Sequence, residues 1–132
     1  MSFTQAVQSV FQNYANFSGR AMRSEYWWWF LFNILAGVAL GFIELAIGLA
    51  SVLTGLWTLG TILPNWSVAA RRLHDRGQSA WVLLALPAMT VPALLFPPLI
   101  FVLLLIAISI LVVLALPGDK FPNDFGPPPT VP

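Results

Sequence analysis

The sequence contains few charged residues and no cysteine. Its 132 residues include six Lys or Arg and five Asp or Glu, so charged residues make up 8% of the chain, about a third of the ~25% usual in a soluble domain. The formal net charge of +1 offers no basic face for nucleic acid. Without cysteine the chain has no disulfide, no thiol nucleophile and no thiolate metal ligand. A soluble domain, a disulfide scaffold and a nucleic-acid-binding protein are therefore poor interpretations.

Charge is absent altogether from three long segments. No Asp, Glu, Lys or Arg occurs at residues 26–43, 45–70 or 77–118. Apolar segments of about 18 or more residues with few charges predict transmembrane helices. Residues 1–19 lack the basic start and continuous apolar core of a signal peptide. We therefore expect an integral membrane protein that keeps its first apolar segment.

Residues 2–18 predict an amphipathic helix. Ser2 followed by Gln5 resembles a capping box. The apolar residues then recur at steps of three and four, as on one face of a helix: Phe3, Val7, Val10, Phe11, Tyr14 and Phe17. The polar face lacks the Lys and Arg that strengthen surface binding. The helix is expected either to lie on the membrane surface or to pack on the cytoplasmic end of the protein.

Two apolar blocks each predict a helical hairpin. At ~1.5 Å per residue, one helix over residues 27–70 would be about twice the ~30 Å hydrocarbon thickness, so this block should cross twice with a turn near 48–51. In the second block, 81–116, Pro97 and Pro98 lack the N–H that a helix needs. A re-entrant pair is the alternative there, because each arm is short. The expected fold is all-α, a single polytopic membrane domain over 1–132 with four transmembrane helices as two hairpins, at about 27–47, 52–70, 81–96 and 99–116.

The cations fix an expected orientation. They precede the first span or follow the second and fourth: Arg20, Arg23, Arg71, Arg72, Arg76 and Lys120. With four spans all six lie on one side, which the positive-inside rule makes cytoplasmic. Five of the six tryptophans fall at the same interface, as an aromatic belt should. Both termini are therefore expected in the cytoplasm, the C-terminal one in a Pro-rich tail over 117–132.

The densest polar cluster follows the second span and contains Arg71, Arg72, His74, Asp75 and Arg76. Three interpretations compete for it. The guanidiniums could hold a phosphate or phospholipid headgroup. His74 and Asp75 could act as acid and base, although a single histidine leaves too few ligands for zinc. Alternatively the arginines are topology determinants, with Asp75 neutralising one of them.

A smaller polar group, Arg20, Arg23 and Glu25, precedes the first span on the same side. We expect Arg23 or Glu25 to pair with Asp75 or Arg72 and so join the two hairpins. Glu25 and Asp75 are thus the candidates for structural ion pairing. The candidates for binding an anion or a lipid headgroup are Arg20, Arg23, Arg71, Arg72, His74 and Arg76.

The first two spans contain a few polar residues. Glu44 is the only charge between residues 26 and 70, and intramembrane acids are functional candidates. Its distance along the helix from Trp27, about 26 Å, places it near the outer interface, where an acid costs little, so a structural role is favoured. Asn33 and Asn65 could line a polar cleft, although a kink at Pro64 with local polar repair explains them equally well.

Three segments resemble the bacterial family known as domain of unknown function 805. They are FSGRAMRSEYW at 17–27, RRLHDRGQSAW at 71–81 and NDFGP at 123–127. The resemblance covers nearly the whole chain and implies a small multi-span inner-membrane protein with no established activity, cofactor or substrate. Departures are Ala80, where the family usually has Gly, and the tail residues Phe121, Pro122 and Pro128.

All three motifs map to the cytoplasmic side, so we expect them to form one surface. Asn123, Phe125 and Gly126 should form a turn that docks the tail, with Phe125 against the loop over 72–81. Tail carbonyls should then satisfy part of the hydrogen-bonding capacity of the arginines.

The favoured function is that of a non-enzymatic binding or scaffold protein without cofactor or metal. Its cytoplasmic face would hold an anionic lipid, a small anion or a membrane-protein partner, and the chain could form a homo-oligomer. The alternative is an oligomeric channel or transporter subunit that uses Glu44 with Asn33 and Asn65. The third hypothesis is an enzyme that acts on a phosphorylated lipid through His74 and Asp75.

Overall fold

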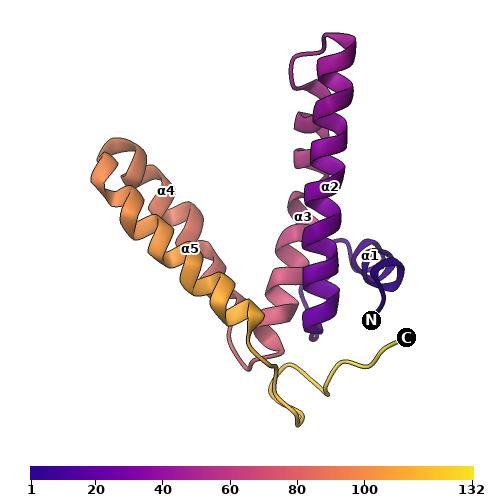
Figure 1. The fold of residues 1–132 in the computed structure, drawn as a ribbon. Coiled ribbons are helices and arrows are strands. Elements are labelled where there is room, and N and C mark those ends of the chain that lie inside the picture. The colour runs from indigo at the N-terminus through magenta and orange to yellow at the C-terminus, as the bar shows by residue number, and fades with distance from the viewer. The chain divides into compact units, whose positions relative to one another are not determined.

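The computed structural model describes residues 1–132, and all of its regular elements are helical. The all-α prediction is therefore confirmed. In chain order the elements are α1 (Phe3–Gln12), α2 (Arg23–Ile47), α3 (Val52–His74), η1 (Ala80–Leu84), α4 (Ala85–Leu95), η2 (Pro97–Leu99) and α5 (Ile100–Ala115) (Figure 1).

The chain forms two compact units. The first comprises residues 1–17, 24–68 and 130–132, and the second comprises 18–23 and 69–129. The first unit contains α1, all of α2 except Arg23, and most of α3. The second contains the end of α3, the hairpin of α4 and α5, and most of the tail.

Two helical segments are long and apolar enough to cross a membrane, judged by length and composition: α2 and the continuous run of η2 and α5, Pro97–Ala115. The run of η1 and α4, Ala80–Leu95, is apolar but shorter. α3 is long enough, but polar side chains such as Thr58, Thr61 and Asn65 lower its hydropathy. Length and composition thus identify two of the four predicted spans.

α1 begins with the predicted capping box. Ser2 Oγ accepts from the Gln5 N–H at 3.3 Å, and Gln5 Oε1 accepts from the Ser2 N–H at 2.9 Å. The helix ends at Gln12, six residues before the predicted end. Asn13 explains the early end, because its side chain donates to Ser9 O at 2.9 Å, and asparagine favours such local bonds over a continued helix.

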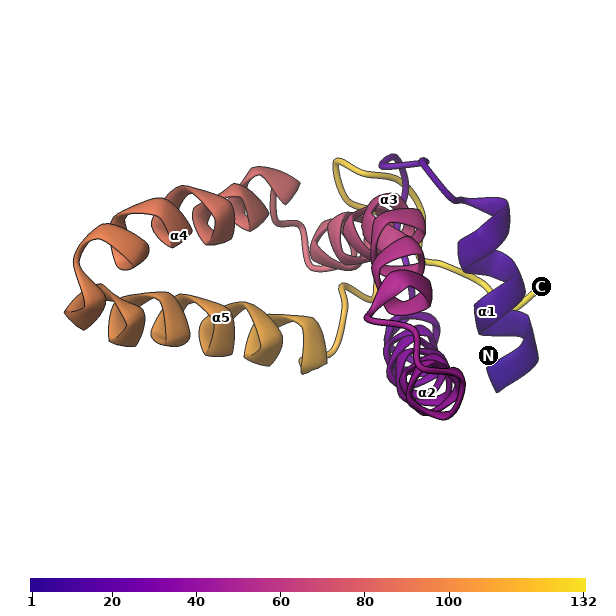
Figure 2. The same ribbon diagram turned by 90° about the horizontal axis from the view of Figure 1, so that it is seen from above.

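α2 and α3 run antiparallel and side by side (Figures 1 and 2). The turn between them lies at the predicted position, where Gly48 and Ser51 have φ values of 72° and 59°. Close approach of the helices is helped by Gly41, where an added Cβ would lie 4.0 Å from Thr54 Cγ2. Small residues permit such packing between membrane helices.

Asn33 and Asn65 bind two indoles at the centre of this hairpin. Trp29 Nε1 donates to Asn65 Oδ1 at 2.7 Å, and Trp57 Nε1 donates to Asn33 Oδ1 at 2.7 Å. Asn33 Nδ2 also donates to Asn65 Oδ1 at 3.2 Å. The amides therefore satisfy aromatic N–H groups, and the polar cleft suggested for them is occupied by side chains of the hairpin itself.

Pro64 lies inside α3 and is buried. A proline deprives the carbonyl four residues earlier of its helical donor, and that carbonyl belongs to Gly60. The hydroxyl of Tyr14 donates to Gly60 O. The segment after α1 thus repairs the hydrogen bond that Pro64 removes.

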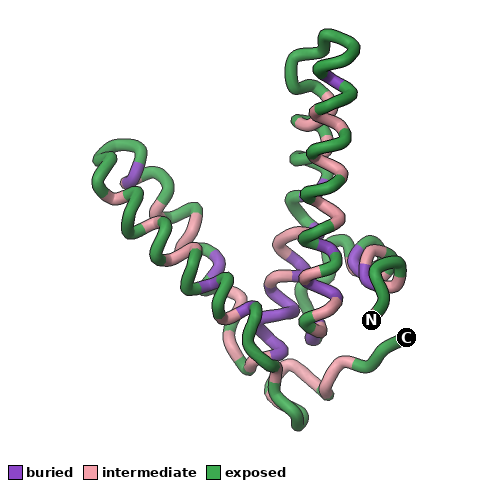
Figure 3. Tube along the Cα trace, in the orientation of Figure 1, coloured by how far each residue is buried: buried purple, intermediate pink, exposed green.

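In the second unit, α4 and α5 form an antiparallel hairpin (Figures 1 and 2). Ser79 caps η1 by accepting from the Trp81 N–H at 3.3 Å. The chain turns at Phe96 and the following Pro97 and Pro98, as predicted. Most side chains of the hairpin are exposed (Figure 3). An apolar surface of this kind requires lipid or another apolar cover.

Candidate functional site

α3 ends in a turn that Gly77 closes. Gly77 has a φ of 66°, and its N–H donates to His74 O at 2.9 Å while the Gln78 N–H donates to Leu73 O at 3.0 Å. This pair of bonds is a Schellman motif, in which glycine accepts the left-handed conformation at least cost. The local sequence therefore positions the polar residues at this end of α3.

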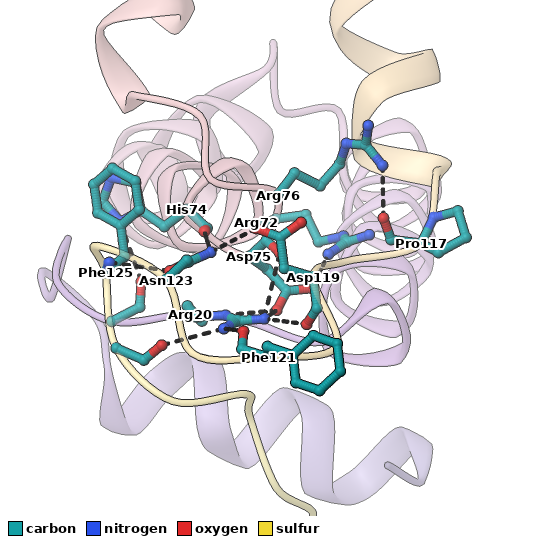
Figure 4. Close-up of polar contacts among 12 residues, drawn as sticks. Arg20, Arg72, His74, Asp75, Arg76, Pro117, Asp119, Phe121, Asn123 and Phe125 are labelled. Carbon is teal, nitrogen blue, oxygen red and sulfur yellow. Dashed lines mark hydrogen bonds and ion pairs between the residues drawn. The ribbon is translucent and has the colours of Figure 1, made fainter.

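Asp75 is the centre of the cluster (Figure 4). Its Oδ1 accepts from Arg20 Nε at 2.9 Å and lies 2.9 Å from Arg20 Nη2, and its Oδ2 pairs with Arg72 Nη1. The side chains of Arg20 and Arg72 are 1% and 0% exposed, and that of Asp75 is 7% exposed. Two buried cations share one carboxylate, so the rest of their solvation must come from neutral acceptors.

Backbone carbonyls provide those acceptors. Arg20 donates from Nη1 to Phe121 O at 2.9 Å and to Gly126 O at 3.1 Å, and from Nη2 to Asp119 O at 2.5 Å. Arg72 donates from Nε to Leu114 O at 3.0 Å and from Nη2 to Leu116 O. Arg72 thus caps the free carbonyls at the end of α5, whereas Arg20 binds the tail.

Arg76 makes a similar contact. Its Nη1 donates to Pro117 O at 2.6 Å, while its Nε is buried without a hydrogen-bond partner. Burial lowers the pKa of Arg72, which lies beyond the predicted span of 52–70, and the ion pair with Asp75 opposes that shift. Because arginine stays protonated in proteins, Arg72 is a charged partner of Asp75.

The tail forms a tight turn against the end of α3. Asn123 and Gly126 exchange backbone hydrogen bonds of 3.1 and 2.9 Å, and Asn123 Nδ2 donates to His74 O at 3.0 Å. The ring of Phe125 stacks on His74 with 3.9 Å between centroids and 2° between planes. His74 Nδ1 lies 3.1 Å from Gly19 O, which can only accept, so this nitrogen carries a proton.

Two tail residues at the cluster were not among the sequence candidates. The Asp119 N–H donates to Asp75 O at 2.7 Å. A Cβ on Gly118 would lie 1.8 Å from Asp75 Oδ2, so only glycine allows this approach. Their signal in the sequence was Pro117-Gly118-Asp119 directly after the last apolar segment, a combination typical of turns.

The remaining candidates lie apart from Asp75 or contact it in another way. Asp75 pairs with Arg20 instead of the suggested Arg23, which is exposed at the start of α2. Arg71 is buried, and its carbonyl accepts from the Ala21 N–H at 3.0 Å. Glu25 belongs to the first unit, where it accepts from Ser9 Oγ at 2.9 Å.

Glu44 also belongs to the first unit and is 5% exposed. Its two oxygens accept from the backbone N–H and the hydroxyl of Thr54, each at 2.9 Å. The Thr54 N–H is one of the donors at the start of α3 that no helical carbonyl can satisfy. Glu44 therefore caps α3 from the preceding helix.

Chemically, the groups around Asp75 form a closely connected polar network. Both oxygens of Asp75 are engaged by arginines, and His74 is held by Gly19 and Phe125. The contacts of Asp75 and of the Arg20 and Arg72 guanidiniums occupy the groups that an open anion site would use. In this conformation the network joins the segment before α2, the end of α3 and the tail.

The helices are those of a small all-helical membrane protein, because long apolar helices with internally satisfied backbones are suited to the bilayer. The chain belongs to the family described as Protein of unknown function (DUF805), whose model matches residues 14–127. The matched range contains every residue of the cluster.

Its relatives include two inner membrane proteins of Escherichia coli strain K12. The chain is 47% identical to Inner membrane protein YhaI over 78 residues, which cover 58% of this chain and 66% of the relative. It is 40% identical to Inner membrane protein YhaH over 77 residues, which cover 54% of this chain and 64% of the relative. The matches thus span just under two thirds of each relative. No solved structure matches the chain.

Proposed function

We propose that this chain is a non-enzymatic inner-membrane protein with four spans and both termini in the cytoplasm, and that it binds anionic phospholipid headgroups at its cytoplasmic face. The spans are α2, α3, the run of η1 and α4, and the run of η2 and α5. With a rise of about 2.0 Å per residue in η1 and 1.5 Å in α4, the third span is roughly 26 Å long. That is close to the ~30 Å hydrocarbon thickness.

α3 suits the bilayer because its polar side chains are satisfied within the hairpin. Thr58 and Thr61 donate to the carbonyls of Thr54 and Trp57, each at 2.8 Å, and Asn65 accepts from Trp29. Satisfied polar groups avoid the cost of several kcal/mol that an unpaired one incurs in lipid. Counting α3 as a span gives an even number of spans, which is what brings all six cations to one side.

The observation that carries the lipid-binding proposal is the uneven charge of the two units. The unit of residues 18–23 and 69–129 contains all six Lys and Arg and three of the five acids, a formal charge of six minus three, or +3. The other unit contains Glu25 and Glu44 and has a formal charge of −2. Cations near an anionic leaflet contribute about 1 kcal/mol each. Arg23 and Lys120 are exposed, so they are the cations offered to headgroups.

Lipid composition around the protein tests the proposal. The full chain is extracted from bacterial membranes in polymer-bounded native discs, and the ratio of phosphatidylglycerol plus cardiolipin to phosphatidylethanolamine is compared with that of the bulk membrane. We expect enrichment of the anionic lipids, reduced at least about twofold in the double variant Arg23→Gln/Lys120→Gln, because binding gains about 1 kcal/mol per cation.

Asp124→Asn is the matched control, since it changes an exposed charge in the same tail and should keep or increase the enrichment. A wild-type disc with the bulk composition, or a double variant indistinguishable from wild type, would refute headgroup binding. The channel alternative is less favoured, because Glu44, Asn33 and Asn65 are engaged with Thr54 and with two indoles.

A further inference from the structure

We infer that Arg20 is a phosphate-binding residue whose site is occupied by the chain's own tail, so that the tail acts as a displaceable strap over an anion site. The inference rests on the proposed function, in that it names a specific site for anionic groups on the same face. The ligand class is a phosphate group, either free or as the phosphodiester of a lipid headgroup.

The division of Arg20's hydrogen bonds supports this inference. Nε and Nη2 both face Asp75 Oδ1, each at 2.9 Å. The Nη1 and Nη2 atoms donate to three tail carbonyls, those of Asp119, Phe121 and Gly126, at 2.5 to 3.1 Å. Arginine binds phosphate through N–H groups at such distances. The tail oxygens therefore occupy positions that phosphate oxygens would take, while Asp75 keeps the guanidinium in place.

The charge of the cluster favours replacement of the tail carbonyls by a phosphate group. Arg20 and Arg72 share the single carboxylate of Asp75, which leaves one buried positive charge solvated only by neutral carbonyls. Hydrogen bonds between two charged groups are roughly twice as strong as those between neutral groups. Arg76 Nε, buried without a partner in the same unit, adds unused donor capacity. An anion would supply the negative charge that the three tail carbonyls lack.

The tail is held by few contacts apart from Arg20. Residues 117–129 contain no helix, and Phe121 is 78% exposed. The tail's other attachments are the Asn123 bond to His74 O, the stack of Phe125 on His74, the Asp119 N–H bond to Asp75 O and the Arg76 bond to Pro117 O. Proline, which offers no N–H for further bonds, occupies five of these thirteen positions. Loss of one attachment should therefore release the strap without removing Arg20 from Asp75.

Phosphate binding by the full chain in maltoside micelles tests the inference. Inorganic phosphate is titrated by calorimetry into wild type and into Phe125→Ala, which removes the stack but leaves every Arg20 contact. An aromatic pair is worth about 0.5 to 1.5 kcal/mol, so phosphate should bind about two- to tenfold more tightly to Phe125→Ala. Phe96→Ala is the matched control, since it makes the same change on an exposed side chain of the same unit that lies outside the tail and makes no contact with Arg20, and it should leave the affinity unchanged.

A second variant, Gly118→Ala, loosens the tail by a different route, so the test does not depend on Phe125→Ala alone. In Gly118→Ala the added Cβ would meet the Asp75 carboxylate, so either the tail or that carboxylate must shift. A spin label on Asp124→Cys reports the release, because the natural chain has no cysteine. Adding Arg20→Gln to either variant should abolish the gain in phosphate affinity.

Short-chain phosphatidylglycerol, titrated in parallel, identifies the source of the phosphate group. A larger gain with this lipid assigns the site to a headgroup, and an equal or larger gain with phosphate assigns it to a free anion. If neither release variant binds phosphate or phosphatidylglycerol more tightly than wild type, or if the gain survives Arg20→Gln, the strap inference is overturned. Lipid enrichment that depends on Arg23 and Lys120 would then still stand, so the two proposals fail separately.

Discussion

Asp75 is the residue on which the cytoplasmic network depends. It is buried, and it is the shared ion-pair partner of Arg20 and Arg72. The sequence identified all three as polar residues of one face, yet it suggested Arg23 or Glu25 as the link to Asp75. Composition and spacing could not choose Arg20, because its contact with Asp75 joins residues 55 positions apart. Only the folded chain decides which of several nearby arginines is buried.

Replacing Asp75 with Asn should destabilise the protein strongly. The change leaves the buried guanidiniums of Arg20 and Arg72 without their carboxylate, and breaking a buried ion pair costs about 3–5 kcal/mol. Reversible unfolding in mixed micelles would measure the loss of free energy of unfolding. Asp124→Asn removes an exposed acid of the same unit and should change stability by less than about 0.5 kcal/mol. Equal losses in the two variants would contradict the central role of Asp75.

At the scale of elements, helix ends are completed by residues from other segments. Glu44 of α2 caps the start of α3, Arg72 satisfies carbonyls at the end of α5, and Tyr14 replaces the donor that Pro64 removes. The cap formed within a few residues by Ser2 and Gln5 was predicted from sequence. The caps formed by distant residues were not predicted from sequence. Each of them ends on a backbone N–H or C=O, and nearly every residue has these groups, so the sequence does not mark which one is bound.

Glu44→Ala should lower the stability of the α2–α3 hairpin. It removes both acceptors of Thr54, and leaving a buried donor unsatisfied costs about 1–3 kcal/mol. Glu44→Gln should cost less, since an amide oxygen can still accept the Thr54 N–H and only the charge at the helix start is lost, worth about 0.3–1 kcal/mol. Unfolding in micelles gives both values. The capping role would be wrong if the two substitutions were equally costly or if neither had an effect.

At the scale of the whole molecule, the cations are confined to one of the two units. The second unit contains a hairpin with a largely exposed apolar surface and all six cations of the chain. The long apolar segments predicted the hairpins. They did not establish the number of crossings, because two of the helical segments are either shorter or less apolar than a standard span.

The accessibility of single introduced cysteines would show how many times the chain crosses the membrane. The natural chain has no cysteine, so no native residue has to be replaced first. In spheroplasts, an impermeant maleimide should label Ala50→Cys and Phe96→Cys. Ala15→Cys and Asp124→Cys should react only after the membrane is opened. These positions are exposed in the structure. A cysteine that fails to react is therefore shielded by the membrane and not by the fold of the protein.

The position of Phe96 discriminates between four spans and a re-entrant pair. If Ala50→Cys reacts from outside but Phe96→Cys does not, α4 and α5 do not cross the membrane. Labelling of Asp124→Cys in intact spheroplasts would contradict the proposed cytoplasmic tail.

The sequence by itself determined the membrane class, the two apolar blocks, their turns and the local caps. These features depend on apolar length and on hydrogen bonds between residues a few positions apart, both of which are visible in a linear pattern. The tertiary structure decided the partners of Asp75, the burial of Arg20 and the docking of the tail. Those contacts join residues up to 106 positions apart, and many end on backbone carbonyls. A carbonyl acceptor is the same at every position, so only the fold can select which ones an arginine binds.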